Sequence, residues 1–244
     1  MTRSTVNAPL AGRTAVVTGA TRGIGRAIAE RLRADGARVT ATGRAVAGEG
    51  PEGCAYRAAD LSDAASTQDF ADWLQALQPD ILVNNAGANR LAPIDATDAE
   101  TMAALHRLNV VAPMLLARAV LPAMRERRWG RIVNIASIWS LRSQPGRAAY
   151  SASKFALDGL SAAIAAEVAA DNVLVNCVSP GFVDTALLRR MLDEQGIAEL
   201  VARVPMRRLA QPAEIAAFVA WLAGPENTFI SGQNIPIDGG YTRT

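Results

Sequence analysis

The sequence predicts a doubly wound α/β fold, in which a parallel sheet of about seven strands is covered by helices on both faces. Short apolar segments alternate with amphipathic segments along the 244 residues, as in parallel sheets. Hydrophobic residues make up 50% of the chain and aromatic residues only 5%, which fits an α/β protein better than an all-β one. A glycine-rich turn also follows the first apolar segment.

Each element follows from a local pattern. Residues 14–18 (TAVVT) read as a buried strand, and the helix predicted over 25–35 ends at Gly36. A long helix is predicted over 99–127, interrupted or tilted near Pro113 and Pro122. The remaining strands are expected at 38–42, 55–59, 81–84, 131–135, 173–178 and 234–237, and the remaining helices at 67–77, 148–170 and 212–223.

The connection between the second and third strands departs from this alternation. It contains Gly48, Gly50, Pro51 and Gly53, so we expect its helix to be shortened or absent. Nothing in the sequence resembles a linker or an internal repeat, which favours one domain over 12–244. Residues 1–11 lack the apolar core of a signal peptide and are expected to form an N-terminal extension.

Composition excludes several classes of function. The net charge is +2, from 25 basic and 23 acidic residues, so we expect no nucleic-acid partner. No apolar run approaches the length of a bilayer span, and we expect no membrane partner. His106, Cys54 and Cys177 form no metal-ligand pattern, so no metal site is expected. Two distant cysteines suit a reducing cytoplasm, with a single disulfide as the minor alternative.

The turn over residues 18–25 (TGATRGIG) has the physics of a dinucleotide-binding turn. Glycines let the backbone approach a pyrophosphate, and the following helix offers free N–H groups and the positive end of its dipole. The spacing of Gly19, Gly23 and Gly25 is GxxxGxG rather than GxGxxG. A structural turn would also hold three glycines, but the position between the first strand and the first helix favours cofactor binding.

Tyr150 and Lys154 are four residues apart in a predicted helix, which puts both side chains on one face. A nearby ammonium favours the phenolate and lowers the pKa of a tyrosine. The pair is therefore a candidate for proton transfer. A surface tyrosine above a solvated lysine would give the same spacing.

Four segments together resemble the short-chain dehydrogenase/reductase family: residues 18–25, 84–87 (NNAG), 150–154 (YSASK) and 180–181 (PG). The resemblance extends from about Gly12 to Tyr241 and looks most like the 3-oxoacyl-acyl-carrier-protein reductase type. It implies a single-domain Rossmann fold and an oxidoreductase that transfers hydride between a nicotinamide cofactor and a carbonyl or secondary alcohol.

The resemblance implies a catalytic group of Asn109, Ser137, Tyr150 and Lys154. Tyr150 would be the acid in reduction and the base in oxidation, while Ser137 would hold the substrate oxygen. Lys154 would bind the ribose hydroxyls and lower the pKa of Tyr150. Asn109 would kink its helix and hold a water in a proton relay to Lys154. The lone histidine weakens a hydrolase interpretation based on a Ser–His–acid triad.

Cofactor contacts follow from the same resemblance. Asp60 resembles an acid that contacts the adenine, residues 180–185 resemble a loop that holds the nicotinamide carboxamide, and Asn84 is expected to line the cofactor and steady the central sheet. The expected cofactor-binding residues are Gly19, Thr21, Arg22, Gly23, Ile24, Gly25, Arg44, Asp60, Leu61, Asn85, Ala86, Gly87, Tyr150, Lys154, Pro180, Gly181, Val183 and Thr185.

Charge at the end of the second strand predicts NADP(H) rather than NAD(H). Enzymes that use NAD place a carboxylate there for the ribose 2′-hydroxyl, whereas this chain has Gly43 followed by Arg44. Arg22 and Arg44 can both pair with a 2′-phosphate through forked charge-assisted bonds. Two merely solvated arginines are the alternative.

The substrate side is less defined. The segment at about 186–207 resembles a mobile lid, and Arg90, Arg142 and Arg147 are either anion-binding or simply solvated. The resemblance implies a homotetramer, with a dimer as second choice. The leading function is a ketone or 3-oxoacyl reductase; a secondary-alcohol or sugar dehydrogenase working in the oxidising direction and a non-catalytic cofactor-binding scaffold are the alternatives. The expected substrate-binding residues are Ser137, Trp139, Gln144, Tyr150 and Phe182, with Asn89, Arg90 and Ile138 as further candidates.

Overall fold

The seven predicted strands form one parallel sheet. The computed structural model describes residues 8–244. The strand order is β3-β2-β1-β4-β5-β6-β7, and the order reverses between β1 and β4, where ligands bind in open α/β sheets. The strands are β1 (Thr14–Val17), β2 (Arg38–Gly43), β3 (Ala55–Ala58), β4 (Ile81–Asn84), β5 (Gly130–Ile135), β6 (Val173–Pro180) and β7 (Asn234–Ile237).

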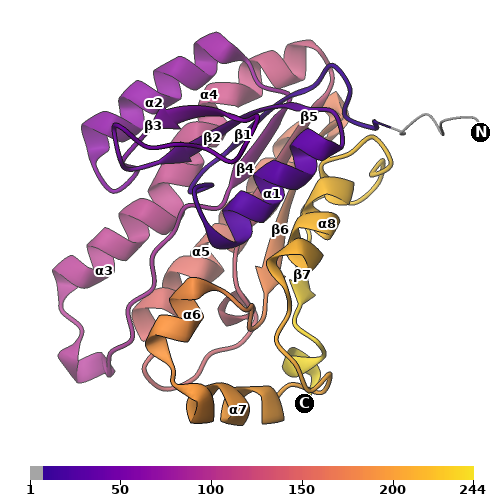
Figure 1. Ribbon diagram of the computed structural model, residues 1–244. Helices are drawn as coiled ribbons and strands as arrows, with labels where there is room; N and C mark the ends of the chain where they lie inside the picture. Colours follow the sequence, from indigo (N-terminus) through magenta and orange to yellow (C-terminus); the bar gives the residue numbers. More distant parts are fainter. Residues whose placement is uncertain (1–7) are drawn as a thin grey trace, which may run out of the picture.

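Helices cover both faces of the sheet (Figure 1). One face carries α1 and α8, which pack against each other, and the other carries α2, α4 and α5. The predicted doubly wound fold is thus confirmed. The helices are α1 (Gly23–Ala34), α2 (Ala64–Leu77), α3 (Ala99–His106), α4 (Ala112–Glu126), α5 (Ala148–Val168), α6 (Ala186–Met191), α7 (Glu194–Ala202) and α8 (Pro212–Leu222).

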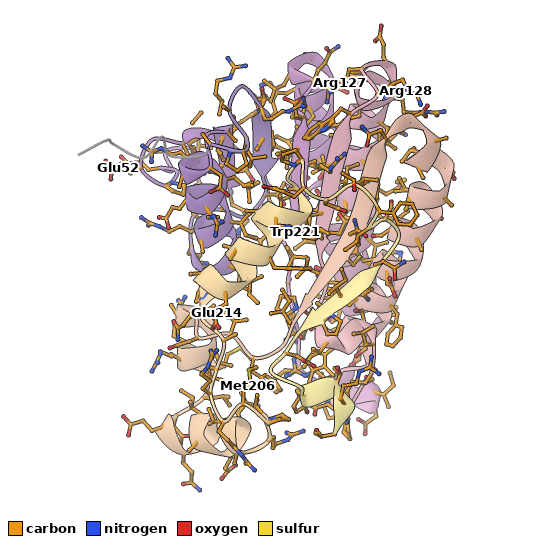
Figure 2. The ribbon with its side chains drawn as sticks, turned by 90° about the vertical axis from the view of Figure 1, so that its right-hand side faces the viewer. Glu52, Arg127, Arg128, Met206, Glu214 and Trp221 are labelled. Carbon is orange, nitrogen blue, oxygen red and sulfur yellow. The ribbon has the colours of Figure 1, made fainter. Side chains whose placement is uncertain are left out.

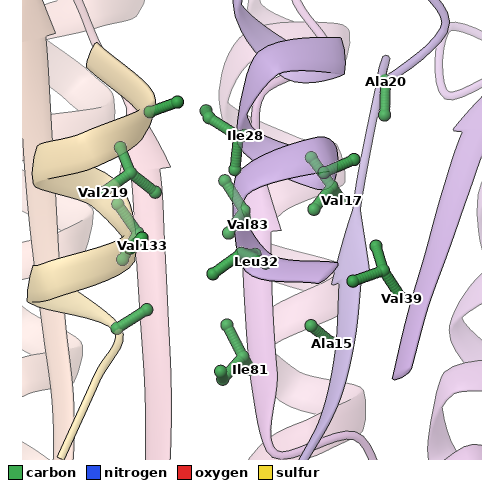
Figure 3. Packing of buried hydrophobic residues seen from close by; sticks show 14 of the residues in the cluster. Ala15, Val17, Ala20, Ile28, Leu32, Val39, Ile81, Val83, Val133 and Val219 are labelled. Carbon is green, nitrogen blue, oxygen red and sulfur yellow. The ribbon is translucent and has the colours of Figure 1, made fainter. Parts of the chain in front are cut away.

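Apolar side chains from the sheet and from the helices α1 and α8 form the core between these two layers. Figure 3 shows Ile28 and Leu32 of α1 facing strand residues such as Val83, with Val219 approaching from α8. All four are fully buried, and burial of one such side chain contributes about 1.5–3 kcal/mol. This packing fixes the first turn of α1 against the end of β1, where the predicted cofactor turn lies.

The predicted long helix is interrupted near Pro113. A π-helical turn, Arg107–Val111, joins α3 to α4, and the Ala112 N–H donates to the Arg107 carbonyl five residues back. Pro113 has no N–H to donate to the carbonyl of Asn109, so the α-helical ladder breaks at that point. Pro122 lies inside α4, which continues through it.

Two boundaries differ from the prediction. The Asp63 carboxylate accepts from the Ser66 N–H at 2.8 Å and caps α2, so this helix begins three residues early. The extension predicted over 1–11 is too long, because Leu10 is 1% exposed in the core and its N–H donates to the Asp35 carbonyl. Residues 1–7 lie outside the described residues. The absence of a helix between β2 and β3 is confirmed.

One helical stretch, Ala99–Glu126, is long and apolar enough for a membrane span by length and composition. The expectation that no stretch reaches this length is therefore wrong. Within the fold, 44% of its most apolar window is buried, and Leu116 and Val120 of α4 belong to the core beneath the sheet. The apolarity of this stretch is thus the apolarity of a core helix.

Candidate active site

The predicted site residues meet at the carboxyl edge of the sheet. The turn after β1, the NNAG loop after β4, the turn after β5 and the loop after β6 all end there. The first turns of α1 and α5 begin at this edge too. A parallel sheet brings these ends together whatever their separation in sequence.

The glycine-rich turn is locked to the NNAG loop. The Asn85 amide donates to the carbonyl oxygens of Thr18 at 2.9 Å and Gly19 at 3.1 Å. A side chain at position 25 would place its Cβ 2.3 Å from that amide nitrogen, so only glycine fits there. Gly19 and Gly23 have φ values of +63° and +58°, a conformation that also favours glycine.

The start of α1 fits a phosphate group. Its N-cap residue, Arg22, makes no side-chain capping bond, and the first turn contains no acidic residue. The first N–H groups of a helix have no intrahelical acceptors, and the dipole adds positive potential. These donors are therefore available to an anion such as a cofactor pyrophosphate.

The NNAG loop itself is held by a threonine that sequence reasoning missed. The buried Thr18 hydroxyl accepts from the N–H groups of Asn85 at 3.0 Å and Ala86 at 2.9 Å. The Asn84 amide donates to Asn134 across the β4–β5 pair at 2.8 Å. Asn84 thus steadies the sheet, as predicted.

The predicted adenosine side combines two arginines with one carboxylate. Arg22 and Arg44 are exposed. Hydrogen bonds from Ser62 lower the pKa of Asp60, with a smaller contribution from the charge of Arg44. Leu61 is buried beneath this corner.

The end of β2 leaves no room for a side chain. A Cβ on Gly43 would lie 2.6 Å from the Thr21 methyl carbon and 3.0 Å from the Tyr56 hydroxyl. A carboxylate for the ribose 2′-hydroxyl would therefore require this corner to rearrange. The structure agrees with the charge argument for NADP(H) at this position.

Ser137 and Tyr150 lie together where β5 ends and α5 begins. Ser137 is 8% exposed and starts a 3-10 turn, Ile138–Ser140, by accepting from the Trp139 N–H at 3.3 Å. Burial raises the pKa of Tyr150, while a hydrogen bond with Ser137 and the charge of Arg147 oppose that rise. The Ser137 hydroxyl is therefore close enough to Tyr150 to affect the ionisation of its phenol.

Lys154 lies one turn along α5 and is 5% exposed. Its ammonium donates to the Ile135 carbonyl at 2.8 Å and lies 5.8 Å from the centre of the Tyr150 ring. Burial lowers the pKa of Lys154 to about 8. The expectation that Lys154 lowers the pKa of Tyr150 is not met in this structure, because the desolvation of Tyr150 outweighs every nearby positive charge.

Asn109 ties three elements together from the π-helical turn. Its side-chain oxygen accepts from the Ala88 N–H, and its amide nitrogen donates to the Ala88 carbonyl, both at 3.0 Å. The same nitrogen donates to the Ser153 hydroxyl at 2.9 Å. The predicted helix kink is present, and the side chain fastens the loop after β4 to α5.

The loop after β6 closes over the glycine-rich turn. A Cβ on Gly181 would clash with Asp238 at 2.8 Å, and the Thr185 methyl group lies near Gly23. Thr185 also caps α6 by accepting from the Leu188 N–H at 3.3 Å. Val183 is buried and pairs with Ala210. Pro180 ends β6 directly before this loop.

Trp139, Phe182 and Tyr241 form an aromatic cluster at the predicted substrate side. Its ring centres lie 4.8–6.5 Å apart, and Tyr150 packs against the same cluster. Trp139 is 4% exposed, so it supports the site from below. Sequence reasoning missed Tyr241, whose only signal is its place just after β7.

The predicted lid consists of α6 and α7, which lie beside the carboxyl edge (Figure 1). Arg203, just after α7, donates to the Tyr241 hydroxyl at 2.6 Å and to Gln144 at 3.4 Å. These bonds join the lid segment to the aromatic cluster. His106 has no part in this arrangement and lines a separate hollow of about 320 Å³ beside α2.

Comparison with known families identifies the family to which the chain belongs. The sequence model described as enoyl-(acyl carrier protein) reductase matches residues 19–242. The chain belongs to the short-chain dehydrogenase/reductase family. This assignment confirms the resemblance read from the four sequence segments, and the chain is an oxidoreductase of that family.

Similar members of the family are reductases of oxoacyl groups. A 3-oxoacyl-[acyl-carrier-protein] reductase FabG of Vibrio cholerae serotype O1 is 38% identical over 245 residues, which cover 95% of this chain and 98% of the relative. An acetoacetyl-CoA reductase of Allochromatium vinosum is 37% identical over 241 residues, covering 93% and 98%.

Two solved structures of the family are similar along nearly the whole chain. A 3-oxoacyl (acyl-carrier-protein) reductase of Agrobacterium tumefaciens C58 with NADP bound has a TM-score of 0.89 and 36% identity, and covers 96% of both chains. A gluconate 5-dehydrogenase of Burkholderia cenocepacia J2315 in complex with NADP and tartrate has a TM-score of 0.88 and 31% identity, covering 98% of both.

Proposed function

We propose that the protein is an NADP(H)-dependent ketoreductase that acts on a ketone or 3-oxoacyl substrate. The observation that carries the proposal is the arrangement of Ser137, Tyr150 and Lys154 at the sheet edge beside the glycine-rich turn. The reductases of oxoacyl groups among its relatives support the same reaction.

In this proposal, each predicted catalytic residue acts at a defined atom. When bound, NADPH would supply a hydride to the carbonyl carbon, and the products would be the secondary alcohol and NADP⁺. The Tyr150 phenol donates a proton to the carbonyl oxygen as negative charge develops there, and the Ser137 hydroxyl holds that oxygen. The raised pKa of Tyr150 keeps it protonated before hydride transfer.

Lys154 is the third member of the proposed catalytic group. In the proposal its ammonium binds the cofactor ribose and restores the proton that Tyr150 gives up. With a pKa of about 8, this lysine exchanges protons more readily near neutral pH than a solvated lysine. Asn109 keeps Lys154 in register by bonding Ser153, the residue before it.

Binding of NADP(H) rests on the adenosine corner and on relatives. Arg22 and Arg44 are exposed cations beside Gly43, and no carboxylate fits at that position without rearrangement. Relatives with NADP bound share this fold. We therefore infer that Arg22 and Arg44 would bind the 2′-phosphate of NADP(H).

A second candidate is oxidation of a secondary alcohol or sugar acid on the same scaffold. The gluconate 5-dehydrogenase neighbour, with a TM-score of 0.88, favours this candidate. The chemistry is reversible, so the ratio of oxidised to reduced cofactor sets its direction.

We also propose a cytoplasmic homotetramer. The α8 side of the edge strand β7 exposes apolar residues, with Trp221 40% and Phe229 97% exposed. Figure 2 shows Trp221 on α8, beside β7. Apolar surface next to an unpaired strand edge is typically covered by another chain. Light scattering of the purified protein measures the assembly directly.

A substrate panel tests the proposed reaction. Ketones, 3-oxoacyl thioesters and the matching alcohols are followed through nicotinamide absorbance with NADPH, NADH and their oxidised forms. We expect reduction with NADPH to give the highest kcat/KM. Faster turnover with NADH would contradict the cofactor assignment, and the absence of any turnover would favour the cofactor-binding scaffold.

A further inference from the structure

The arginines of this protein fall into two groups according to what their side chains contact. At the end of the molecule opposite the lid, Arg127 and Arg128 pair with Asp80 and Asp171. Figure 2 shows these two arginines far from Met206, which lies just beyond α7. Near the lid, Arg189 pairs with a carboxylate as well. These guanidinium groups have structural partners.

Arg147 differs from all of them. Within residues 8–244 its guanidinium has no hydrogen bond and no ion pair, and the side chain is partly buried. The other arginines without such partners in this part of the chain are more exposed to solvent than Arg147. A partly desolvated guanidinium without acceptors is costly, so its position calls for an anionic ligand.

Arg147 lies close to Tyr150 of the proposed reaction centre. It is the N-cap residue of α5, and Tyr150 follows three residues later in the first turn of the same helix. Its guanidinium lies over the ring of Trp139, with Cζ 5.2 Å from the ring centre. This cation–π contact uses no N–H group of the guanidinium, so these groups are left for a carboxylate.

Electrostatics agrees with this placement. The charge of Arg147 opposes the rise in the pKa of Tyr150. Burial lowers the pKa of Arg147, and the phenol groups of Tyr150 and Tyr241 counteract that effect. The guanidinium is thus close enough to Tyr150 to favour ionisation of its phenol.

We propose that Arg147 binds the carboxylate of the substrate, and that the preferred substrate is a short oxo acid or the corresponding hydroxy acid. This inference rests on the proposed ketoreductase function and specifies its substrate. Because Arg147 and Tyr150 are one helical turn apart, the carboxylate lies only a few bonds from the reacting carbonyl. The phosphates of an acyl carrier are many bonds from that carbonyl and do not meet this condition.

The other arginines considered from the sequence do not share these properties. Arg142 donates to the backbone carbonyls of Tyr241 and Thr244, both at 3.2 Å. Arg90 is exposed, and hydrogen bonds from Thr101 lower the pKa of Asp98 with a smaller contribution from the charge of Arg90. Arg142 also stacks on an aromatic ring of the cluster, with Cζ 5.2 Å from the centre of Tyr241. It is therefore a matched control for Arg147.

The test compares acetoacetate with its neutral methyl ester, using NADPH and the full-length wild-type, Arg147→Gln and Arg142→Gln proteins. We expect the wild-type kcat/KM to be higher for the acid. The ratio of acid to ester should fall about tenfold to hundredfold in Arg147→Gln, the loss expected for one charge-assisted interaction, and stay within about threefold in Arg142→Gln. NADPH binding by fluorescence confirms that each variant is folded.

Two further arms separate the alternatives. Acetoacetyl-CoA is compared with the neutral acetoacetyl thioester of N-acetylcysteamine, which lacks the phosphates. If Arg147→Gln affects only this second ratio, the anion is a carrier phosphate and the oxo-acid proposal is overturned. If the wild type reduces the ester and thioesters without preferring the acid, the inference fails while the ketoreductase function stands. No turnover of any of the four compounds would overturn both.

Discussion

The ammonium of Lys154 donates to the main-chain carbonyl of Ile135 at 2.8 Å, two residues before Ser137. One bond therefore couples α5 to the end of β5 and fixes the distance between the lysine and the serine turn. The lysine is 5% exposed and forms no ion pair with a carboxylate of the described residues. Its ammonium binds the dipole of a carbonyl group and not a carboxylate, so no ion pair offsets the lowering of its pKa by burial.

The low pKa of Lys154 predicts a pH-dependent stability. Burial lowers the pKa to about 8 from an ordinary value of 10.5, so between these values the unfolded chain binds more protons and stability rises with pH. The cost of charging the buried lysine is fully present below pH 8. Relative to Lys154→Met, the unfolding free energy of the wild type should rise by about 1–3 kcal/mol from pH 7 to pH 10. Urea titrations without cofactor measure it, and parallel pH curves for the two proteins would contradict the assignment.

Removing the phenol of Tyr150 should abolish most turnover. We expect Tyr150→Phe to lower kcat at least about a hundredfold, because no other group in the described site is placed to donate the proton. NADPH affinity, measured by fluorescence titration, should change by less than about threefold. Substantial remaining turnover would refute the role of Tyr150.

Asn109→Ala should lower both stability and activity. The variant leaves the Ala88 N–H and carbonyl without their partners, with an expected loss of about 1–3 kcal/mol. Ser153→Ala removes the Ser153 bonds to Asn109 and to the Tyr150 carbonyl but leaves both bonds to Ala88 in place, so it is the milder control. Thermal unfolding and kcat report the effect, and equal melting temperatures for wild type and Asn109→Ala would disprove it.

Arg44→Gln should weaken binding of NADPH but not of NADH. We expect KM for NADPH to rise about tenfold to hundredfold through the loss of one charge-assisted interaction with the 2′-phosphate. Arg26→Gln is the control, because Arg26 is exposed on α1 and pairs with Glu30 at 2.8 Å. An equal rise in KM for both cofactors would point to a general electrostatic effect.

Much of this architecture was predictable because it depends on local patterns. The strand sequence ILVN at Ile81–Asn84 and the glycines at 19, 23 and 25 each impose a conformation, and a parallel sheet then gathers the strand ends. The interval from Ser137 to Tyr150 likewise placed a hydroxyl next to a phenol. The start of α2 was missed because the cap formed by Asp63 depends on the backbone conformation at that residue.

Contacts between distant segments were not predictable. The bond from Arg203 to Tyr241 depends on the path of the lid, and the bond from Lys154 to Ile135 depends on how α5 packs on β5. The pKa of Tyr150 was expected to be low because the pattern shows the neighbouring charge. It does not show the desolvation that outweighs that charge in the folded chain.

The π-helical turn Arg107–Val111 also sets the direction in which Asn109 points relative to the apolar face of α4. Below it, α4 presents apolar residues to the sheet; at the turn, Asn109 faces the loop after β4 and α5. One residue of an α-helix corresponds to about 100° of rotation, so deleting one residue here would turn α3 and Asn109 away while α4 stayed seated. The π-helical turn thus lets α4 pack against the core while Asn109 faces the proposed reaction centre.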